Sequence, residues 1–421
     1  MEILIVSQFF YPEMGAPAAR FHDFGRLMVE KGHRVTVITG FPNSPSGIIP
    51  SEYRGKLRQE EYIDGIRVLR GWLYASGRLN KFSKTLGFAS FALSASLQVL
   101  FRKLRPDVII ATSPPPTAAI AGIIAAKRYR APLVVDIRDI WPEAIVNSGE
   151  LKSQVLVGVL KKIEKMLYDS ASAVTVVTEG KKARLIEKGV DAAKLAIIQN
   201  GVDLGRFENL SANKESLISL GVPAERFTVI YAGIFNSAQG LEILVDAAKI
   251  LRERHPEIAA TVHFMLVGDG VEKPNLIKRC SRESLEEMFT FVPIQPREKI
   301  PVLLCSADAI VVPLAPRGDT HTVPSKIYES MASAKPVLVS ADAAPSQVIR
   351  AAGAGLATAA GDAEGLSESI KLLASDPGLC ATLGSQGRAY SSRCDRRKLV
   401  LEWDKVFHGL VRTKSRPQAD A

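Results

Sequence analysis

The sequence predicts an α/β fold with two consecutive domains, each built around a parallel sheet. Short apolar runs alternate with longer amphipathic segments, a rhythm typical of parallel strands joined by helical right-handed crossovers. The runs form two series, "ILIV", "RVTVIT", "DVIIAT", "LVVDI" and "AVTVVT", then "FTVIYAG", "FMLVGDG", "MFTFVP", "AIVVPL" and "PVLVS". Turn and polar residues cluster between the two series. We therefore predict an N-terminal domain over residues 1–200 and a C-terminal domain over residues 201–394.

The composition supports two folded domains and leaves three classes of partner open. The chain has 421 residues, of which 47% are hydrophobic, enough for two cores. The net charge of +10 attracts nucleic acids, anionic membranes and phosphorylated substrates alike. Nucleic acid is the least favoured of the three, because the basic residues are dispersed and not interleaved with aromatic residues. The four cysteines have no metal-type spacing, so we predict no metal site and free thiols in a reducing cytoplasm.

The stretch "TVPSKIYESMASAKPVL", residues 322–338, predicts an anion site at a helix start. A helix beginning near Ser325 would point its unpaired N–H groups and its positive dipole end at a ligand, and Lys326 would add a full charge. Glu329 would share that helix face and could hold a vicinal diol between its carboxylate oxygens. Phosphate beside ribose suggests a nucleotide. An ordinary helix start with an intrahelical Lys–Glu pair remains the alternative.

Other candidate residues follow the apolar runs, where ligands bind in open α/β sheets. Gly15 and Ala16 follow the first strand, where a plain turn is the alternative reading. Asp139 lies in "RDIWPE", a polar and aromatic set at a strand end, with an Arg–Asp surface pair as the alternative. Glycines that a phosphate-binding turn would use occur in "YAGIFNSAQGLE" and "LVGDG". The loop before residue 322 brings further candidates, Arg317 and His321.

Residues 79–105 do not fit the alternating pattern. An apolar stretch of about sixteen residues with basic flanks would reach about 24 Å as a helix, short of the roughly 30 Å hydrocarbon core, so we predict that it does not span a bilayer. It could lie on an anionic membrane surface, or it could be a helix buried on the first sheet. The first residues, "MEILIVSQFF", lack a basic region or cleavage site, and so predict a protein that is not secreted.

The motifs together resemble the retaining sugar-nucleotide glycosyltransferases of family four. The resemblance rests on "NGVD", "GDG" and "ESMASAKPV" in this order, with "ILIVSQFFYPEMGAPAAR" and "VIYAGIFNSAQGLEILVDAAKIL", and covers nearly the whole chain. "TGFPNSPSG", "RDIWPE" and "PSKIYE" are similar to the subgroup that builds bacterial surface polysaccharides, including N-acetyl-fucosamine transferases of O-antigen and capsule synthesis. The resemblance implies the GT-B fold, two facing Rossmann-like domains and a C-terminal helix that crosses back to the first domain.

The resemblance also implies roles for the candidate residues. The C-terminal domain would bind a UDP-sugar and the N-terminal domain the acceptor, with chemistry in the cleft between them. Glu329 would bind the ribose, and Ser325 and Lys326 the diphosphate. The remaining donor contacts implied are Gly233 at the phosphate, Asp269 and Val292 around the base, and Gly15 and Ala16 at the phosphate and sugar.

The chain departs from the family pattern at three positions. Many members have a sugar-binding glutamate where this chain has His321, and cations where it has Ile234 and Gln239. Arg317 and Lys326 could compensate, because a diphosphate leaving group needs its developing charge stabilised. His321 would then suit an acetamido or deoxy sugar.

These observations predict a membrane-peripheral cytoplasmic enzyme. The resemblance implies that it would transfer a sugar from a UDP-sugar to a polyprenyl-diphosphate-linked acceptor, with front-face attack and retention and without cofactor or metal. Asp139 is the candidate for orienting or deprotonating the acceptor hydroxyl. A UDP-sugar epimerase and a non-catalytic nucleotide-binding partner of an assembly complex are the alternatives. At the C-terminus, residues 395–412 predict a helix packed on the N-terminal domain, and residues 413–421 a disordered tail.

Overall fold

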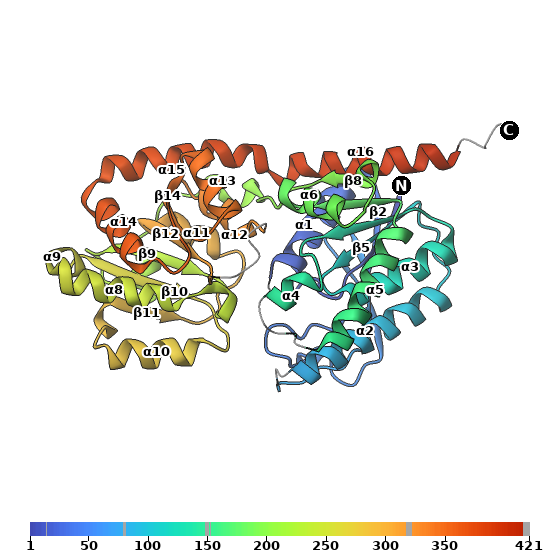
Figure 1. Cartoon of the computed structure of the whole chain (residues 1–421), viewed down its shortest axis with the longest axis horizontal. Helices are drawn as coiled ribbons and strands as arrows, with labels where there is room; N and C mark the ends of the chain where they lie inside the picture. The colour runs from blue at the N-terminus through green and yellow to red at the C-terminus, as the bar shows by residue number, and fades with distance from the viewer. Residues whose placement is uncertain (14, 79–80, 148–150, 152, 317–321, 416–421) are drawn as a thin grey trace. The chain divides into compact units, whose positions relative to one another are not determined.

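The computed structural model describes residues 1–13, 15–78, 81–147, 151, 153–316 and 322–415. The chain divides into two compact units (Figure 1). Unit 1 comprises Met1–Gln199 together with the C-terminal segment from Arg396, and unit 2 comprises Asn200–Asp395. Each unit is an α/β sandwich with its own sheet, which confirms the predicted GT-B class of fold.

Over the described residues, unit 1 has an eight-stranded sheet in the order β3-β4-β2-β1-β5-β6-β7-β8. Every neighbouring pair is parallel except β3 with β4. The strands are β1 (Glu2–Val6), β2 (Arg34–Gly40), β3 (Arg58–Ile63), β4 (Ile66–Gly71), β5 (Val108–Ser113), β6 (Leu133–Ile137), β7 (Ala173–Val176) and β8 (Leu195–Ile197). The central strands are buried on both faces, as continuous apolar runs require.

Helices cover both faces of this sheet. They are α1 (Ala16–Glu30), α2 (Lys81–Phe101), α3 (Pro116–Tyr129), α4 (Glu143–Asn147), α5 (Gln154–Ser170), α6 (Glu179–Glu187) and α16 (Arg396–Ser415). One face packs against α2, α3 and α5, and the other against α1 and α16. The carboxyl ends of the parallel strands therefore point their loops to one edge, where the candidate residues of this unit lie.

The C-terminal helix packs on the first unit, as predicted. The α16 side chains Trp403 and Phe407 lie against Phe24 of α1, with ring centroids 5.2 and 6.1 Å away. Arg396, at the start of α16, also pairs with Asp23 of α1. The helix ends at Ser415, so the predicted end at residue 412 is three residues short. The last predicted tail residues, 416–421, lie outside the described residues.

Helix α2 is longer than the sequence predicts. It has 21 residues, about 32 Å at 1.5 Å per residue, because Lys81 to Thr85 continue the helix ahead of the apolar stretch. The segment Phe82–Phe101 is the one candidate membrane span in the described part of the chain, by length and composition alone. The length argument against spanning is therefore wrong. In this structure one side of α2, with Phe91, Ala95 and Val99, packs into unit 1, and the other side is exposed.

Unit 2 has, in its described residues, a six-stranded parallel sheet in the order β11-β10-β9-β12-β13-β14. The strands are β9 (Phe227–Ala232), β10 (Val262–Val267), β11 (Phe289–Val292), β12 (Ala309–Pro313), β13 (Val337–Ser340) and β14 (Gly355–Thr358). The helices are α7 (Glu215–Ile218), α8 (Glu242–Arg254), α9 (Pro256–Ala259), α10 (Lys273–Arg282), α11 (Ile300–Ser306), α12 (Ser325–Ala332), α13 (Ala344–Ala352), α14 (Ala363–Ser375) and α15 (Pro377–Ser391). Two apolar clusters, one on each face, form the core.

Candidate functional site

Two glycine loops interlock at the carboxyl edge of the unit 2 sheet. The loop after β9 carries Gly233 and the loop after β10 carries Gly268 and Gly270. The Gly233 N–H donates to the Val267 carbonyl at 2.9 Å, and the Phe235 N–H donates to the Asp269 carbonyl at 2.9 Å. A Cβ on Gly268 would lie 1.9 Å from the Gly233 oxygen. The backbones therefore approach too closely for any side chain at this position.

A Gly268→Ala substitution is expected to destabilise unit 2 by about 1–3 kcal/mol and to weaken nucleotide binding. The residue has a φ of 141° and the new Cβ would meet backbone rather than a flexible side chain. Chemical denaturation and UDP titration measure the two effects. Gly221→Ala is the matched control, since Gly221 has a φ of 93° but the atom nearest to its new Cβ would be 3.7 Å away. Equal effects of the two substitutions would contradict the close-approach argument.

Lys326 lies directly over the first of these loops. It comes from the first turn of α12, and its Nζ donates to Gln239 Oε1 at 2.5 Å and to the Tyr231 hydroxyl at 3.1 Å. The ammonium also lies 4.3 Å from the Tyr231 ring centroid. A Cβ on Gly233 would be 2.7 Å from Nζ, so the missing side chain of Gly233 leaves space for the amine. The arrangement places a cation directly against the backbone turn at Gly233.

Burial lowers the pKa of Lys326 to about 7, partly opposed by the nearby charge of Glu329. An anionic donor favours the ammonium form, so the pKa must rise when the donor binds. Donor affinity is therefore expected to fall as the pH rises above 7, approaching about tenfold per pH unit until the pKa of the complex is passed. Calorimetry of UDP binding on either side of pH 7, in buffers of different ionisation enthalpy, measures this fall and the coupled proton uptake.

Gln239→Glu provides the comparison for this pH dependence. A carboxylate at that position would hold the Lys326 amine protonated to higher pH, because the two groups are in hydrogen-bond contact. The fall in affinity should then begin at a higher pH than in the wild type. The role of Lys326 would be contradicted if the wild-type affinity for UDP did not change across pH 7 and if UDP bound without proton uptake.

Glu329 lies one turn further along α12 and is half-buried. Its carboxylate makes no hydrogen bond or ion pair with any residue that the structure describes. Ser325, also half-buried, is the first residue of the helix, after Pro324. The helix start, the cation and an uncommitted carboxylate are therefore in the order that the sequence predicts. Arg317 and His321 lie outside the described residues.

The remaining unit 2 candidates support the glycine loops. Asp269 is exposed, and its carboxylate accepts the Gly270 N–H at 2.7 Å within its own turn. Val292 ends β11, and its carbonyl accepts the Gly268 N–H at 3.0 Å. Lys273 Nζ reaches both the Gly268 carbonyl at 2.9 Å and the Val292 carbonyl at 3.3 Å. Lys273 and Tyr231 were not identified from the sequence; the position of Tyr231 two residues before Gly233 could have indicated an inward side chain.

In unit 1, Gly15 and Ala16 begin α1 at the carboxyl end of β1. Gly15 has a φ of 142° as the residue before the helix, and Ala16 is exposed. The loop is held by the buried Glu13, whose carboxylate accepts the N–H groups of Phe10, Asn43 and Ser44. Burial raises the pKa of Glu13 to about 7, although these hydrogen bonds act to lower it. The sequence analysis did not identify Glu13, although it lies two residues before Gly15.

Asp139, the candidate base, forms an ion pair. One carboxylate oxygen lies 2.9 Å from Nζ of Lys181, a fully buried residue of α6 that also donates to the Arg138 carbonyl. Arg138 is buried beside it and donates to the Pro114 carbonyl at 3.0 Å, and burial lowers its pKa. Lys181 was not identified from the sequence.

Of the residues predicted from the sequence, the structure brings Gly233, Lys326 and Glu329 together in unit 2. Gly15, Ala16 and Asp139 belong to unit 1.

Two family models match consecutive parts of the chain. A glycosyl transferase 4-like domain matches residues 15–201, and a glycosyl transferases group 1 domain matches residues 213–390. The chain is a GT-B glycosyltransferase. The first match covers nearly all of the unit 1 sheet and the second nearly all of unit 2. This membership favours a transferase over the epimerase and non-catalytic alternatives.

The glycosyltransferase is similar to several known proteins. WcaI of Escherichia coli (strain K12), assigned as a glycosyl transferase of colanic acid biosynthesis, is 27% identical over 351 residues, 82% of this chain and 84% of WcaI. The D-inositol 3-phosphate glycosyltransferase of Salinispora arenicola (strain CNS-205) is 23% identical over 259 residues, 59% of this chain and 55% of that protein. HepE of Anabaena, solved in complex with UDP-glucose, superposes with a TM-score of 0.69 at 21% identity, covering 97% of this chain and 100% of HepE. At this identity the likeness to HepE shows the fold.

Proposed function

We propose that this enzyme transfers a sugar, with retention, from a UDP-sugar to a lipid-linked acceptor during the assembly of a bacterial surface polysaccharide. The observation that carries the donor part is the α12 start, where the Lys326 amine lies over Gly233 and Glu329 one turn away has no partner among the described residues. An ammonium and helix N–H groups suit a diphosphate, and a carboxylate suits the two ribose hydroxyls. The UDP-glucose complex of HepE, which has the same fold, supports UDP as the nucleotide.

The chemistry we propose requires neither cofactor nor metal ion. The acceptor hydroxyl attacks the anomeric carbon from the side of the departing diphosphate, which takes up the hydroxyl proton as the old bond breaks. Lys326 and the α12 start stabilise the negative charge that develops on the diphosphate. Asp139 contributes by orienting the acceptor hydroxyl, with its carboxylate held in place by Lys181.

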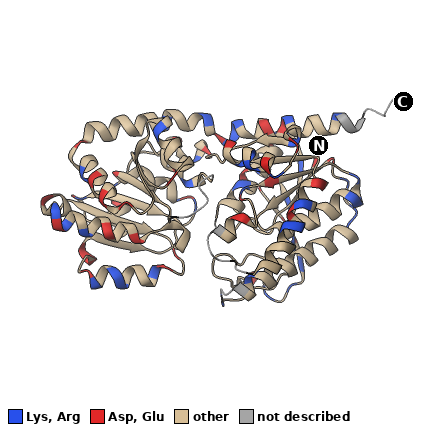
Figure 2. Cartoon of the chain, viewed as in Figure 1, with Lys and Arg blue, Asp and Glu red and all other residues tan. Residues whose placement is uncertain are grey.

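The similarity to WcaI, assigned to colanic acid biosynthesis, supports a surface-polysaccharide acceptor. Helix α2 supports the lipid part and a peripheral location at the cytoplasmic face of the membrane. In Figure 2 it is tan along most of its length, because residues 85–101 hold no charged side chain. An acetamido or deoxy sugar is the donor class that we favour, because this chain has His321 where many members of the family that it resembles have a sugar-binding glutamate.

Release of UDP from a panel of UDP-sugars, with bacterial membrane lipids present or absent, tests this function. We expect lipid-dependent release from one acetamido or deoxy donor. Glu329→Ala should abolish the release, while Glu253→Ala, at the far end of α8, should leave it unchanged. Release that is independent of lipid and specific for a soluble phosphorylated acceptor would overturn the lipid-linked part. No release from any UDP-sugar would overturn the donor assignment.

A further inference from the structure

Helix α2 is apolar on its exposed side as well as on the side that packs into unit 1. Leu93, Leu97 and Phe101, spaced four residues apart, are 63%, 44% and 83% exposed. The neighbouring stripe is polar and faces the protein, where Ser94 Oγ and Gln98 Nε2 would lie 2.5 and 2.4 Å from a Cβ on Gly71. A surface helix in water normally points its apolar stripe inward. The outer side of α2 is therefore suited to an apolar environment.

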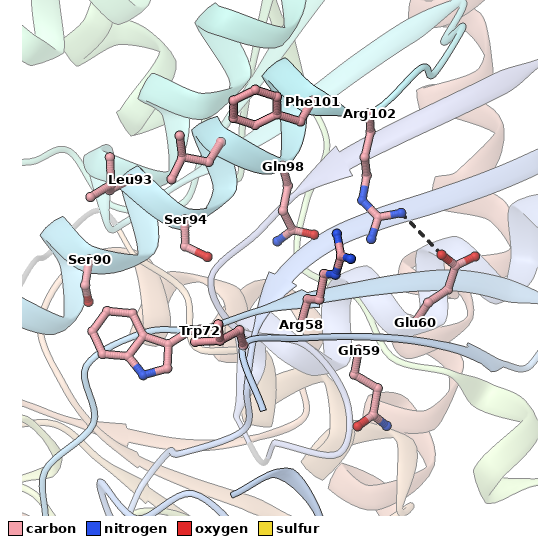
Figure 3. A pocket seen from close by; sticks show the side chains of 12 residues that line it. Arg58, Gln59, Glu60, Trp72, Ser90, Leu93, Ser94, Gln98, Phe101 and Arg102 are labelled. Atoms are coloured by element: carbon pink, nitrogen blue, oxygen red, sulfur yellow. Dashed lines mark hydrogen bonds and ion pairs between the residues drawn. The ribbon is translucent and has the colours of Figure 1, made fainter. Parts of the chain in front are cut away.

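The exposed stripe forms one wall of a groove. The groove has a volume of about 700 Å³, and Trp72, beside the β3–β4 edge of the sheet, lines the opposite side (Figure 3). Leu57 also lines the groove and lies next to Trp72, whose N–H donates to the Leu57 carbonyl at 3.0 Å. Trp72 is 45% and Leu57 is 77% exposed. Trp72 directly follows β4, so this side of the groove begins at the carboxyl edge of the parallel strands, the edge that carries Gly15 and Asp139.

The groove also contains polar groups without partners in the described structure. Both amide atoms of Gln98 are buried and make no hydrogen bond. Arg58 is exposed, makes no hydrogen bond or ion pair with any described residue, and points toward Gln98 across the groove (Figure 3). Arg102 and Glu60 form an ion pair at 3.2 Å, also among the lining residues. A guanidinium and an amide that have no partner are suited to a phosphate group.

These features together fit a lipid with one hydrocarbon chain and a phosphate head. The apolar stripe is one side chain wide and three side chains long. It can therefore contact one hydrocarbon chain along its length, but not two chains side by side. The phosphate would lie at Arg58 and Gln98 below the apolar rim, while the chain crosses the rim into the bilayer. Basic residues beyond the groove, Arg54, Lys56, Lys103 and Arg105, favour an anionic surface.

We propose that the groove between α2 and the β3–β4 edge binds the lipid part of the acceptor, namely the polyprenyl chain and the phosphate attached directly to it. Arg58 and Gln98 hold the phosphate, and Leu93, Leu97, Phe101 and Trp72 contact the first part of the isoprenoid chain. This inference rests on the proposed lipid-linked acceptor and names where this chain recognises it. The groove then directs the acceptor sugar toward the carboxyl edge of the unit 1 sheet.

The test measures binding of the full chain to three kinds of phosphatidylcholine vesicle: plain, carrying polyprenyl phosphate, or carrying phosphatidylglycerol at matched surface charge. We expect polyprenyl phosphate vesicles to bind about tenfold more tightly than phosphatidylglycerol vesicles, the effect of one charge-assisted contact. Leu97→Gln and Arg58→Gln should remove this preference. Leu100→Gln is the matched control, because Leu100 is on the same helix and 46% exposed but does not line the groove. Lys103→Gln is the corresponding control for Arg58.

The outcomes separate the groove from the proposed function. Equal binding to the two anionic vesicles, or equal effects of Leu97→Gln and Leu100→Gln, would overturn the groove while leaving a lipid-linked acceptor possible in the UDP-release assay. Binding to no vesicle would overturn the groove, and lipid-independent UDP release would then also overturn the lipid-linked acceptor. The substituted side chains are exposed, so we expect all four variants to fold as the wild type does. Circular dichroism of each variant checks this.

Discussion

Replacement of Lys326 by methionine is expected to lower kcat about 100- to 1,000-fold, the usual effect of removing one group that stabilises a developing oxyanion. Methionine keeps the length and apolar stem of lysine but carries no charge. The Tyr231 hydroxyl and Gln239 would remain at the site, but neither can supply the positive charge that a departing diphosphate requires. The effect should appear in kcat as well as in donor affinity, because the charge on the diphosphate increases as the bond breaks.

Steady-state kinetics of UDP release measures this loss, with Lys278→Met as the control. Lys278 is exposed on α10 and makes no contact with the glycine loops. Lys278→Met should retain wild-type kinetics. A Lys326→Met enzyme with unchanged kcat and a raised KM only would show that the amine binds substrate without stabilising the transition state.

Replacement of Asp136 by asparagine is expected to destabilise unit 1 by about 3–5 kcal/mol, because it leaves a buried guanidinium without its counter-charge. Asp136 is fully buried at the end of β6 and accepts two hydrogen bonds from Arg20, at 3.1 and 3.2 Å, and one from Thr175 at 2.8 Å. Arg20 also donates to the carbonyl of Ile198, next to Gln199, where the first segment of unit 1 ends. The ion pair therefore links α1, β6, β7 and the end of that first segment.

Urea denaturation followed by circular dichroism measures this loss as a shift of the unit 1 transition. Asp169→Asn is the control, because Asp169 and Lys165 form an ion pair at 3.1 Å with side chains 62% and 79% exposed. An exposed pair contributes about 0–1 kcal/mol. Similar midpoints for the two variants would contradict the importance of the buried pair.

The alternation of apolar runs predicted most of the fold, because buried parallel strands have long apolar stretches. Strands β3 and β4 were not predicted, since "RQEEYI" and "IRVLRG" are rich in charge. Their charges are satisfied by pairing: Arg70 is fully buried but contacts Glu61 and the Tyr11 carbonyl. Such a pairing depends on tertiary contacts that no local pattern contains. The short strands β8 and β14 carried too few apolar residues to be recognised.

The candidate site was predictable where it depends on helix chemistry and not where it depends on packing. The α12 start could be read from "PSKIYE", because a proline, a lysine and a glutamate at this spacing fix both the helix start and its face. The contact of Gln239 with Lys326 could not, because 87 residues separate them in the sequence. For the same reason the ion pair of Asp139 with Lys181 appears only in the folded chain.

Calorimetric titration of the full chain with UDP tests the central claim most directly, namely that the α12 start of unit 2 is a nucleoside diphosphate site. We predict one UDP per chain, competition by the UDP-sugar that is turned over, and at least about tenfold weaker binding by Glu329→Ala, which removes charge-assisted hydrogen bonds to the ribose. Glu253→Ala should bind as the wild type does. UDP binding that is absent, or that is unchanged in Glu329→Ala, would contradict the account.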